Sequence, residues 1–322
     1  MKKALITGVH GQDGSYLAKF MLDKGYNVKG VLKKEELNNL FRHRYLNIRD
    51  KVDYSTVNLL DERKVFSLIK EYEPCEIYNL AAISSVGYSF RYPEKTINNN
   101  NKIIVNILNS LRKINKDIKL YQASSSEMYG NPDELPVTLN TPLNPISPYG
   151  ISKSFAYRTV NNYRSCYGLF AVNGILFNHE SFLRDENYFV KKMIRWSLEI
   201  KKEIREKLFL GNLDVKRDFG YSPDYVVTMW RMLQKDKPED YIVCSGKSIS
   251  LKDIVNYVLK KLELNKGVVE IKKSLYRPTE IKNIYGDNTK AKSELNWEYN
   301  KSFYDVLDIL IEEEKQYLKN RK

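Results

Sequence analysis

KALITGVHGQDGSYLAKFMLDKG, residues 3–25, decides the fold of this chain. Residues 3–7 form a short apolar run typical of a buried strand, and residues 16–21 carry apolar side chains at helical spacing. Gly8, Gly11 and Gly14 lie between these two segments. Glycines let the backbone approach a pyrophosphate, and the free N–H groups of a helix N-terminus face its charge. The stretch therefore predicts a strand, a turn and a helix that bind a dinucleotide.

Apolar runs and helical patterns alternate through the first half of the chain. We expect strands at 27–32, 52–60, 76–82, 119–126 and 171–177, and helices at 61–72, 93–114 and 149–168. Strands that alternate with helices pair in parallel through right-handed crossovers. The predicted fold class is therefore α/β, a Rossmann doubly wound parallel sheet, with ligands at the carboxyl ends of its strands.

The chain has 322 residues, more than one hydrophobic core usually serves, so we expect two lobes. The dinucleotide-binding Rossmann domain is predicted at 1–178, with returning segments at about 213–244 and 281–286. A smaller mixed C-terminal lobe, expected to bind the substrate, is predicted at 179–212 and 245–322. We expect this lobe to contain helices at 187–207 and 302–319.

Composition argues against several classes of protein. The net charge of +13 is spread along the chain, which favours a solvated basic surface or phosphorylated ligands over nucleic acid. No apolar run approaches the roughly 20 residues that span a bilayer, and the first run is too short for a signal peptide. Cys75, Cys166 and Cys244 lack metal-ligand spacing. We therefore predict buried thiols, a reducing cytoplasm, no metal site and no membrane partner.

Residues 121–153 hold side chains that can move protons. Ser125 and Glu127 follow an apolar run that ends near Tyr121, and Tyr149 and Lys153 stand four apart at the start of a predicted helix. That spacing places the phenol and the ammonium on one helix face. An ammonium stabilises a phenolate, so Tyr149 is the candidate base for an alcohol that is oxidised. A carboxylate beside these groups can then remove an acidic C–H proton and return it to a leaving hydroxyl.

The second predicted strand ends close to where a dinucleotide ribose is usually held. A carboxylate about 20 residues beyond the glycines typically binds the ribose 2′-hydroxyl of NAD. Lys33 and Lys34 stand there instead and favour the 2′-phosphate of NADP, while the neighbouring Glu35 and Glu36 keep NAD as the alternative. The candidate cofactor-binding residues are Gly8, Gly11, Gln12, Asp13, Gly14, Lys33, Lys34, Asn58, Leu59, Leu80, Ala81, Ala82, Tyr149 and Lys153.

Motifs along nearly the whole chain resemble a known family. GVHGQDGSYL, YNLAA, ASSSEMYG and SPYGISK are similar to motifs of the extended short-chain dehydrogenase/reductase superfamily. LFAVNGILFNHES, FLGNLDVKRDFGYSPDYV and YRPTEI narrow the resemblance to the GDP-mannose 4,6-dehydratases. The resemblance implies bound NADP, a GDP-sugar substrate and an enzyme that oxidises C4, eliminates water across C5 and C6, and returns hydride to C6.

The resemblance also implies roles for individual residues. The catalytic motif corresponds to Ser125, Glu127, Tyr149 and Lys153. The implied substrate-binding residues are Ser84, Ser126, Asn178, Glu180, Arg217, Arg277 and Glu280. Arginines suit a diphosphate because the guanidinium makes paired hydrogen bonds. The family further implies a homodimer or a homotetramer.

Several positions depart from the family pattern. Ser125 replaces a threonine, Lys33 and Lys34 replace paired arginines, and the loop after them is different and shorter. An arginine-rich turn after NHES is replaced by residues 182–185, and Asn58 stands where an acidic residue is expected. These departures leave a related sugar, such as a GDP-manno-heptose, as an alternative substrate.

Two other classes of function stay open from the sequence. The first is a C4 dehydrogenase, epimerase or reductase on the same scaffold, and Glu127 distinguishes it, because elimination needs a second acid or base. The second is a catalytically silent nucleotide-binding regulatory protein, which the intact Ser125, Tyr149 and Lys153 disfavour.

Overall fold

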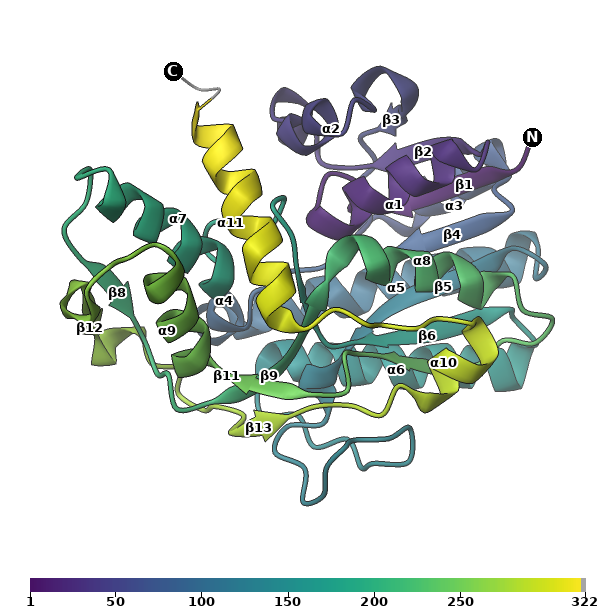
Figure 1. Cartoon of the computed structure of the whole chain (residues 1–322). Helices are drawn as coiled ribbons and strands as arrows, with labels where there is room; N and C mark the ends of the chain where they lie inside the picture. The colour runs from purple at the N-terminus through teal and green to yellow at the C-terminus, as the bar shows by residue number, and fades with distance from the viewer. Residues whose placement is uncertain (320–322) are drawn as a thin grey trace.

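The structure, a computed structural model that describes residues 1–319, is built on a parallel sheet of seven strands (Figure 1). Their order is β10-β6-β5-β4-β1-β2-β3, so the direction of winding reverses between β1 and β4. A reversal of this kind opens a crevice at the carboxyl ends of the strands. The strands are β1 (Lys3–Thr7), β2 (Asn27–Val31), β3 (Asp53–Ser55), β4 (Glu76–Asn79), β5 (Lys119–Ser125), β6 (Ala171–Leu176) and β10 (Tyr241–Val243).

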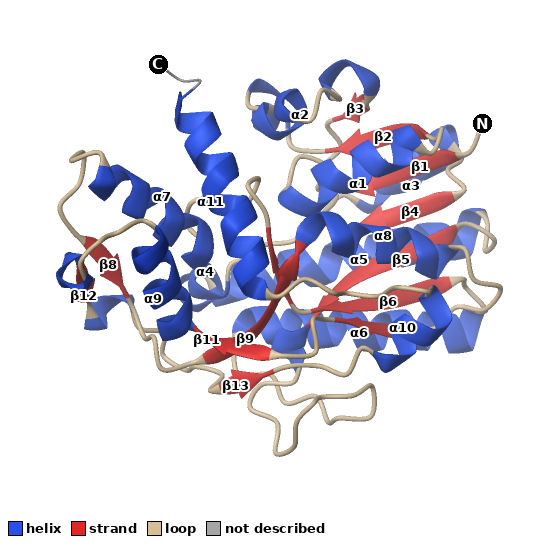
Figure 2. Cartoon of the chain, in the orientation of Figure 1, coloured by secondary structure: helices blue, strands red, loops and turns tan. Residues whose placement is uncertain are grey.

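Helices cover both faces of this sheet (Figure 2). Side chains alternate along β1, so Ala4 and Ile6 join one hydrophobic core and Leu5 joins the other. The first core lies under α1 (Gln12–Asp23) and α8 (Ser222–Leu233), and the second under α3 (Glu62–Tyr72), α5 (Pro93–Ile114) and α6 (Pro148–Tyr167). Shorter helices of this part are α2 (Phe41–Tyr45), α4 (Val86–Arg91) and α10 (Thr289–Leu295). The predicted fold class is confirmed.

A second lobe lies beside the carboxyl ends of the sheet (Figure 1). Its larger sheet has four strands and its smaller sheet has two, and a separate hydrophobic core lies among three helices. The strands are β7 (Asn178–Glu180), β8 (Leu208–Leu210), β9 (Lys216–Tyr221), β11 (Ser248–Ser250), β12 (Val269–Ile271) and β13 (Asn283–Ile284). The helices are α7 (Phe189–Lys201), α9 (Leu251–Lys261) and α11 (Phe303–Lys319).

The chain passes between the lobes at boundaries that differ from the predicted ones. Helix α8 and strand β10 return to the large sheet, and both lie inside the predicted segment 213–244. Strands β9 and β13 were predicted to belong to the dinucleotide-binding domain. They lie instead in the four-stranded sheet, in which β9 pairs with β13, β11 and β7. These short strands carry no local signal of their partner, because pairing is decided by contacts distant in sequence.

Three further expectations need correction. Cys75 and Cys166 are exposed and only Cys244 is buried, because the first two lie at a strand start and near a helix end. Strand β3 spans 53–55 rather than 52–60, and α7 spans 189–201 rather than 187–207.

Among the described residues, none of the helices is both long and apolar enough to cross a membrane.

Candidate active site

The glycine turn after β1 is packed too closely for side chains. Gly8 has a φ of +66°, and a Cβ on this residue would lie 3.0 Å from the backbone of Ala81. A Cβ on Gly14 would lie 2.4 Å from the carbonyl oxygen of Gly8. The turn therefore exposes bare backbone at the N-terminus of α1, which fits the pyrophosphate of a dinucleotide.

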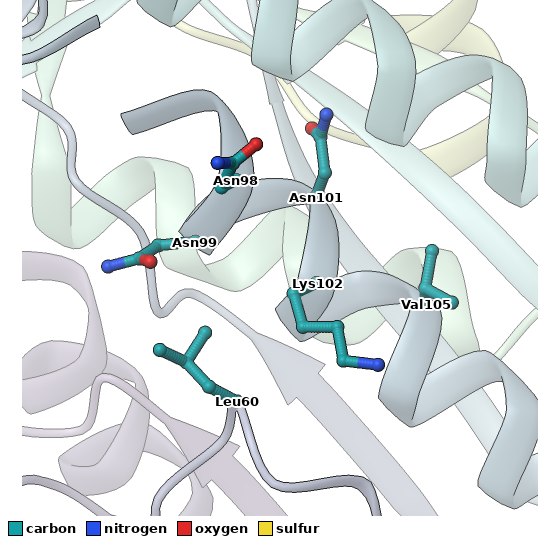
Figure 3. A pocket seen from close by; sticks show the side chains of 6 residues that line it. All are labelled: Leu60, Asn98, Asn99, Asn101, Lys102 and Val105. Atoms are coloured by element: carbon teal, nitrogen blue, oxygen red, sulfur yellow. The ribbon is translucent and has the colours of Figure 1, made fainter. Parts of the chain in front are cut away.

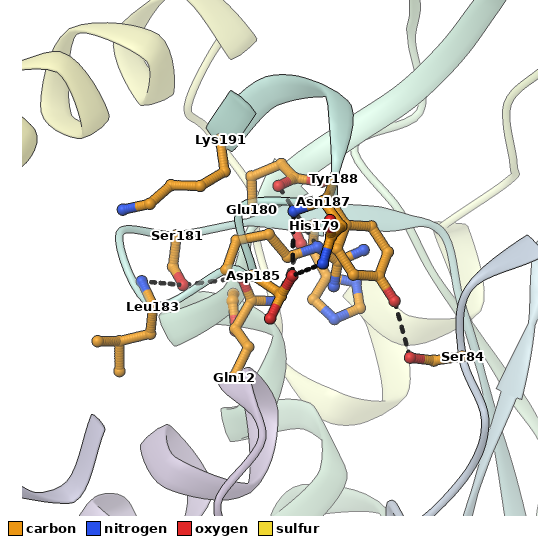
Figure 4. A network of polar contacts seen from close by, with 12 residues as sticks. Gln12, Ser84, His179, Glu180, Ser181, Leu183, Asp185, Asn187, Tyr188 and Lys191 are labelled. Atoms are coloured by element: carbon orange, nitrogen blue, oxygen red, sulfur yellow. Dashed lines mark hydrogen bonds and ion pairs between the residues drawn. The ribbon is translucent and has the colours of Figure 1, made fainter. Parts of the chain in front are cut away.

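The side chains of Gln12 and Asp13, at the start of α1, contact the NHES segment, residues 178–181. Figure 4 shows Gln12 beside this segment. Gln12 Nε2 donates to the carbonyl oxygen of His179 at 3.1 Å, and Gln12 Oε1 accepts from Ser181 Oγ at 2.8 Å. Asp13 Oδ2 lies 2.8 Å from His179 Nε2, and Ser222 Oγ donates to Asp13 Oδ1 at 2.9 Å. These side chains therefore join the two lobes at the N-terminus of α1.

Opposite charges stabilise this contact. Burial alone would raise the pKa of Asp13, but the adjacent His179 holds it well below its usual value. Burial likewise opposes the charged form of His179, yet Asp13 raises the pKa of the imidazole above its usual value. The pair therefore favours aspartate and imidazolium over the neutral forms.

The predicted catalytic side chains come together between β5 and α6. Strand β5 ends at Ser125, whose Oγ accepts from the N–H of Glu127 at 3.3 Å and hydrogen-bonds with the side chain of Tyr149. Lys153 Nζ lies 5.6 Å from the centre of the Tyr149 ring and donates to the carbonyl oxygen of Ala123 at 2.7 Å. The four residue types predicted to move protons therefore share one site.

Local signals position α6 against this strand end. The Ser147 side chain caps the helix by accepting from the N–H of Gly150 at 3.0 Å, and Pro148 occupies the first turn. A Cβ on Gly150 would lie 2.6 Å from the carbonyl oxygen of Glu127. Glycine at this position therefore lets the helix carrying Tyr149 approach the turn that carries Glu127.

Burial controls the protonation of the catalytic groups. It raises the pKa of Tyr149, and the hydrogen bond with Ser125 opposes this effect. It lowers the pKa of Lys153 to about 8, so the ammonium is retained at neutral pH. It also raises the pKa of Glu127, although the positive charges of Arg277 and Arg217 pull the other way. The raised pKa makes Glu127 a better proton acceptor than an ordinary glutamate, as a group that takes up a proton and returns it requires.

Three of the predicted substrate-binding residues gather near Glu127. Arg217 in β9 lies with its Nη2 3.3 Å from Glu280 Oε2, and Arg277 Nη1 lies 3.8 Å from the same oxygen. Arg217 Nη1 also donates to the carbonyl oxygen of Ile281 at 2.6 Å, which fixes the guanidinium. The two arginines are therefore presented together, as binding of a diphosphate requires.

The loop before α7 adds two residues that the sequence did not identify as site residues. The Arg184 guanidinium carbon lies 3.7 Å from the centre of the Tyr188 ring, and both side chains interact electrostatically with Tyr149. Tyr188 also contacts the predicted sugar residue Ser84, with 2.8 Å between the two hydroxyl oxygens (Figure 4). Arg184 lies within residues 182–185, which depart from the family pattern, whereas Tyr188 lies outside them and had no sequence signal.

Glu180 is buried at 3 % exposure rather than open to a ligand. Its Oε2 lies 3.6 Å from Arg184 Nε, and burial raises the pKa of this carboxyl. Its contact with Arg184 makes it a support for the site rather than the substrate contact predicted. Ser126 is buried beside Ser125, and Asn178 is half-buried at the start of β7.

Three of the predicted cofactor-binding residues, Lys33, Lys34 and Asn58, lie in the loops after β2 and β3. Lys33 and Lys34 are exposed, whereas Glu36 Oε2 accepts from the N–H of Lys33 at 2.7 Å and lies 3.3 Å from His10 Nδ1. Asn58 Oδ1 accepts from the N–H of Leu60 at 3.1 Å, which shapes the turn after β3. Positively and negatively charged side chains thus both lie where the ribose of the cofactor is predicted to bind. Leu59 lies in the loop after β3, and Leu80, Ala81 and Ala82 directly follow the end of β4.

A hollow on the outer side of α5 is separate from this site (Figure 3). Its lining consists of Leu60, Asn98, Asn99, Asn101, Lys102 and Val105. It contains none of the predicted catalytic residues, so it does not compete as the reaction centre.

Solved structures share this architecture. A UDP-glucuronic acid 4-epimerase from Bacillus cereus superposes with a TM-score of 0.86 at 23 % identity, covering 98 % of this chain and 99 % of its own. A dTDP-glucose 4,6-dehydratase from Bacillus anthracis, solved with NAD, gives a TM-score of 0.85 at 22 % identity, covering 98 % and 97 %. These likenesses show that the chain shares the fold of both enzymes, a Rossmann sheet with a second lobe at the carboxyl ends of its strands.

Sequence comparison identifies the family of the chain. The GDP-mannose 4,6 dehydratase family profile matches residues 5–310. GDP-mannose 4,6 dehydratase 1 from Arabidopsis thaliana is 40 % identical over 100 % of this chain and 92 % of its own. The human GDP-mannose 4,6 dehydratase is 38 % identical over 96 % of this chain and 90 % of its own. The chain belongs to the GDP-mannose 4,6-dehydratase family, which confirms the family predicted from its motifs.

Proposed function

We propose that this chain is a GDP-sugar 4,6-dehydratase that acts on GDP-mannose, using a bound nicotinamide dinucleotide. The observation that carries the proposal is the shared site of Ser125, Tyr149 and Lys153 with Glu127, beside the paired arginines Arg217 and Arg277. A GDP-manno-heptose is the alternative substrate, because residues 182–185 around the site depart from the family pattern.

Tyr149 is the base for the hydroxyl at C4 of the sugar. Its ionised oxygen accepts the proton of that hydroxyl, and Ser125 and the Lys153 ammonium, 5.6 Å from the centre of the ring, stabilise the negative charge of the phenolate. Ser125 Oγ then donates a hydrogen bond to the oxygen as it becomes a carbonyl. When bound, a nicotinamide would supply the acceptor for the C4 hydride and return that hydride at C6, and the proton that Tyr149 took from the C4 hydroxyl balances the proton needed at C5.

Glu127 carries out the elimination that separates a dehydratase from a plain dehydrogenase. A carbonyl at C4 makes the C5–H acidic, and the Glu127 carboxylate removes that proton. The electron pair of the C5–H bond forms the C5–C6 double bond as the C6–O bond breaks. The proton held by Glu127 passes to the departing hydroxyl, so one water leaves and the carboxylate is regenerated.

The residues of the glycine turn hold the cofactor pyrophosphate, and NADP is the proposed dinucleotide with NAD as the alternative. Lys33 and Lys34 favour the additional phosphate of NADP, while the carboxylate of Glu36 favours a free 2′-hydroxyl. Arg217 and Arg277 bind the diphosphate of the GDP-sugar, with Ser84 and Asn178 beside the sugar. A homodimer or homotetramer in the cytoplasm completes the proposal.

Product mass tests the proposed function. The protein is incubated with GDP-mannose and a panel of other GDP-hexoses and GDP-heptoses, with and without added NADP or NAD. Loss of one water without net cofactor reduction is expected. Loss of two hydrogens with stoichiometric NAD(P)H would instead identify a C4 dehydrogenase, and no conversion with intact binding would favour a regulatory protein.

A further inference from the structure

The hydroxyls of Tyr188 and Ser84 form a bridge between the two lobes. Tyr188 caps the N-terminus of α7 in the second lobe, and Ser84 lies in the loop between β4 and α4 of the Rossmann domain. The two oxygens are 2.8 Å apart, as Figure 4 shows. Tyr188 therefore crosses from the lobe that binds the sugar to the domain that carries the catalytic groups.

The Tyr188 side chain is held in place before any ligand binds. The Arg184 guanidinium stacks on its ring at 3.7 Å, and Arg184 is in turn paired with the buried Glu180. The N–H of Tyr188 donates to the carbonyl oxygen of Asp185 at 3.1 Å, which closes the loop before α7. The hydroxyl is thus preorganised, and little conformational entropy is lost when it accepts a further partner.

The bridge retains hydrogen-bonding capacity and lies next to the reaction centre. A hydroxyl has one donor and two acceptor positions, so a pair that shares one hydrogen bond keeps one O–H donor and several lone pairs. Ser84 is exposed and Tyr188 only half-buried, so a ligand can reach both oxygens. The Arg184 guanidinium that stacks on the Tyr188 ring lies close enough to Tyr149, the proposed base at C4, to oppose the rise in the pKa of its phenol.

We propose that Tyr188, together with Ser84, binds a hydroxyl of the sugar ring other than the one at C4 and contributes to selection of the sugar. A sugar hydroxyl both donates and accepts, which matches the remaining capacity of the bridge. The inference rests on the proposed function, because it needs a sugar at Tyr149. Tyr188 adds a sugar contact beside residues 182–185, in which this chain departs from its family pattern.

Direct binding to GDP and GDP-mannose tests this inference. Tyr149→Phe serves as the background, so that the sugar is bound but not converted. Adding Tyr188→Phe keeps the ring stacked under Arg184 and removes only the hydroxyl. The expected result is a Kd for GDP-mannose raised about 3- to 10-fold, the effect of one hydrogen bond, with the Kd for GDP unchanged. Tyr304→Phe, which alters an exposed tyrosine in α11, is the matched control and leaves both constants unchanged.

The opposite results are equally clear. An unchanged Kd for GDP-mannose overturns the inference. Equal weakening for GDP and GDP-mannose also overturns it, because a bridge that only supports the structure would affect both ligands alike, whether or not they carry a sugar. In the otherwise wild-type enzyme, Tyr188→Phe is expected to raise KM for GDP-mannose while kcat stays within about 3-fold. A wild-type protein that converts GDP-mannose while Tyr188→Phe has no effect removes the inference alone. A wild-type protein that converts no GDP-sugar removes the proposed function.

Discussion

Glu127 is the residue on which the assignment of a dehydratase depends. Ser125, Tyr149 and Lys153 account for oxidation of an alcohol, which many enzymes of this class share. Glu127 lies at the same strand end, its N–H donates to Ser125 Oγ at 3.3 Å, and its carboxylate lies near two arginines. One carboxylate thus turns an alcohol-oxidising site into one that can also eliminate water.

Glu127→Gln is expected to separate the two half-reactions. The amide cannot accept the C5 proton, so water loss should fall by about 10²–10⁴-fold while C4 oxidation persists. Rapid-quench analysis of bound sugar by mass spectrometry distinguishes the 4-keto sugar from the dehydrated product. Glu134→Gln, which changes an exposed carboxylate in the following loop, is the control. Dehydration at the full rate in Glu127→Gln would show that another group removes the proton.

The pH dependence of elimination should report the same residue. Burial raises the pKa of Glu127, so the acidic limb of the rate profile should lie above the value of about 4.3 for an ordinary glutamate. The rate falls as the pH falls through that limb, because protonated Glu127 cannot accept the C5 proton. The measurement is kcat for water loss against pH. A limb at or below the ordinary value would contradict the raised pKa.

At the scale of elements, the contact between α1 and the segment around β7 connects the cofactor turn to the sugar lobe. Gln12 and Asp13 begin α1 immediately after the glycine turn, and their side chains contact His179, Ser181 and Ser222. Any shift of the second lobe therefore acts on the helix whose N-terminus faces the cofactor. Residues predicted to bind the cofactor thus also position the two lobes.

His179→Phe is expected to lower the free energy of unfolding by about 1–3 kcal/mol, because Asp13 loses its buried partner. The phenyl ring preserves the stacking of this residue on Tyr225, whose ring centre is 4.9 Å away. Lys19→Ala breaks the exposed Lys19–Asp23 ion pair in α1, the helix that also carries Asp13. This change should lower the free energy of unfolding by under about 0.5 kcal/mol. Urea unfolding followed by circular dichroism measures both, and equal losses would contradict a buried interaction.

The sign of the pH effect follows from the two pKa shifts. His179 has a raised pKa in the folded state, so its contribution is complete below about 6.5 and is lost as the pH rises through the folded value. Asp13 has a lowered pKa, so its contribution is complete above about 3.9 and is lost as the pH falls. The stability difference between wild type and His179→Phe should therefore be largest between about pH 4 and 6.5.

At the scale of the whole molecule, an exposed apolar face on α6 points to assembly. Ile151 is 45 % exposed and Phe155 is 43 % exposed, and their spacing of four places them on one helix face. Helix α6 packs beside α5, which also reaches the surface. If the proposed homo-oligomer forms, this face is where we expect a second copy to bind.

Phe155→Lys is therefore expected to reduce the mass of the particle to that of a monomer. A charge at this position must be desolvated when two copies meet, which opposes association. Size-exclusion chromatography with light scattering measures the mass. Ile204→Lys, at a 71 % exposed position after α7, is the control and should leave the assembly intact. An unchanged oligomer in Phe155→Lys would place the interface elsewhere, and a wild-type monomer would contradict the predicted assembly.

Those parts of the fold that depend on short-range signals could be predicted from the sequence. The glycine turn and the spacing of Tyr149 and Lys153 are encoded within a few residues, so the Rossmann sheet was identified and the predicted catalytic residues do lie close together. The pairing of β9 with β13 and the contact of Tyr188 with Ser84 were not, because each joins segments far apart in sequence. The burial of Glu180 against Arg184 was missed for the same reason, since exposure is decided by packing between lobes.

The central claim, a dehydratase that returns its hydride to the same sugar, is tested most directly with GDP-mannose deuterated at C4. Proton and deuterium NMR and mass spectrometry of the product locate the label, and absorbance follows any reduced cofactor. The account predicts a 4-keto-6-deoxy product that carries the deuterium at C6, with no accumulation of NAD(P)H. A product that retains its C6 hydroxyl, with deuterium recovered in stoichiometric reduced cofactor, would contradict it.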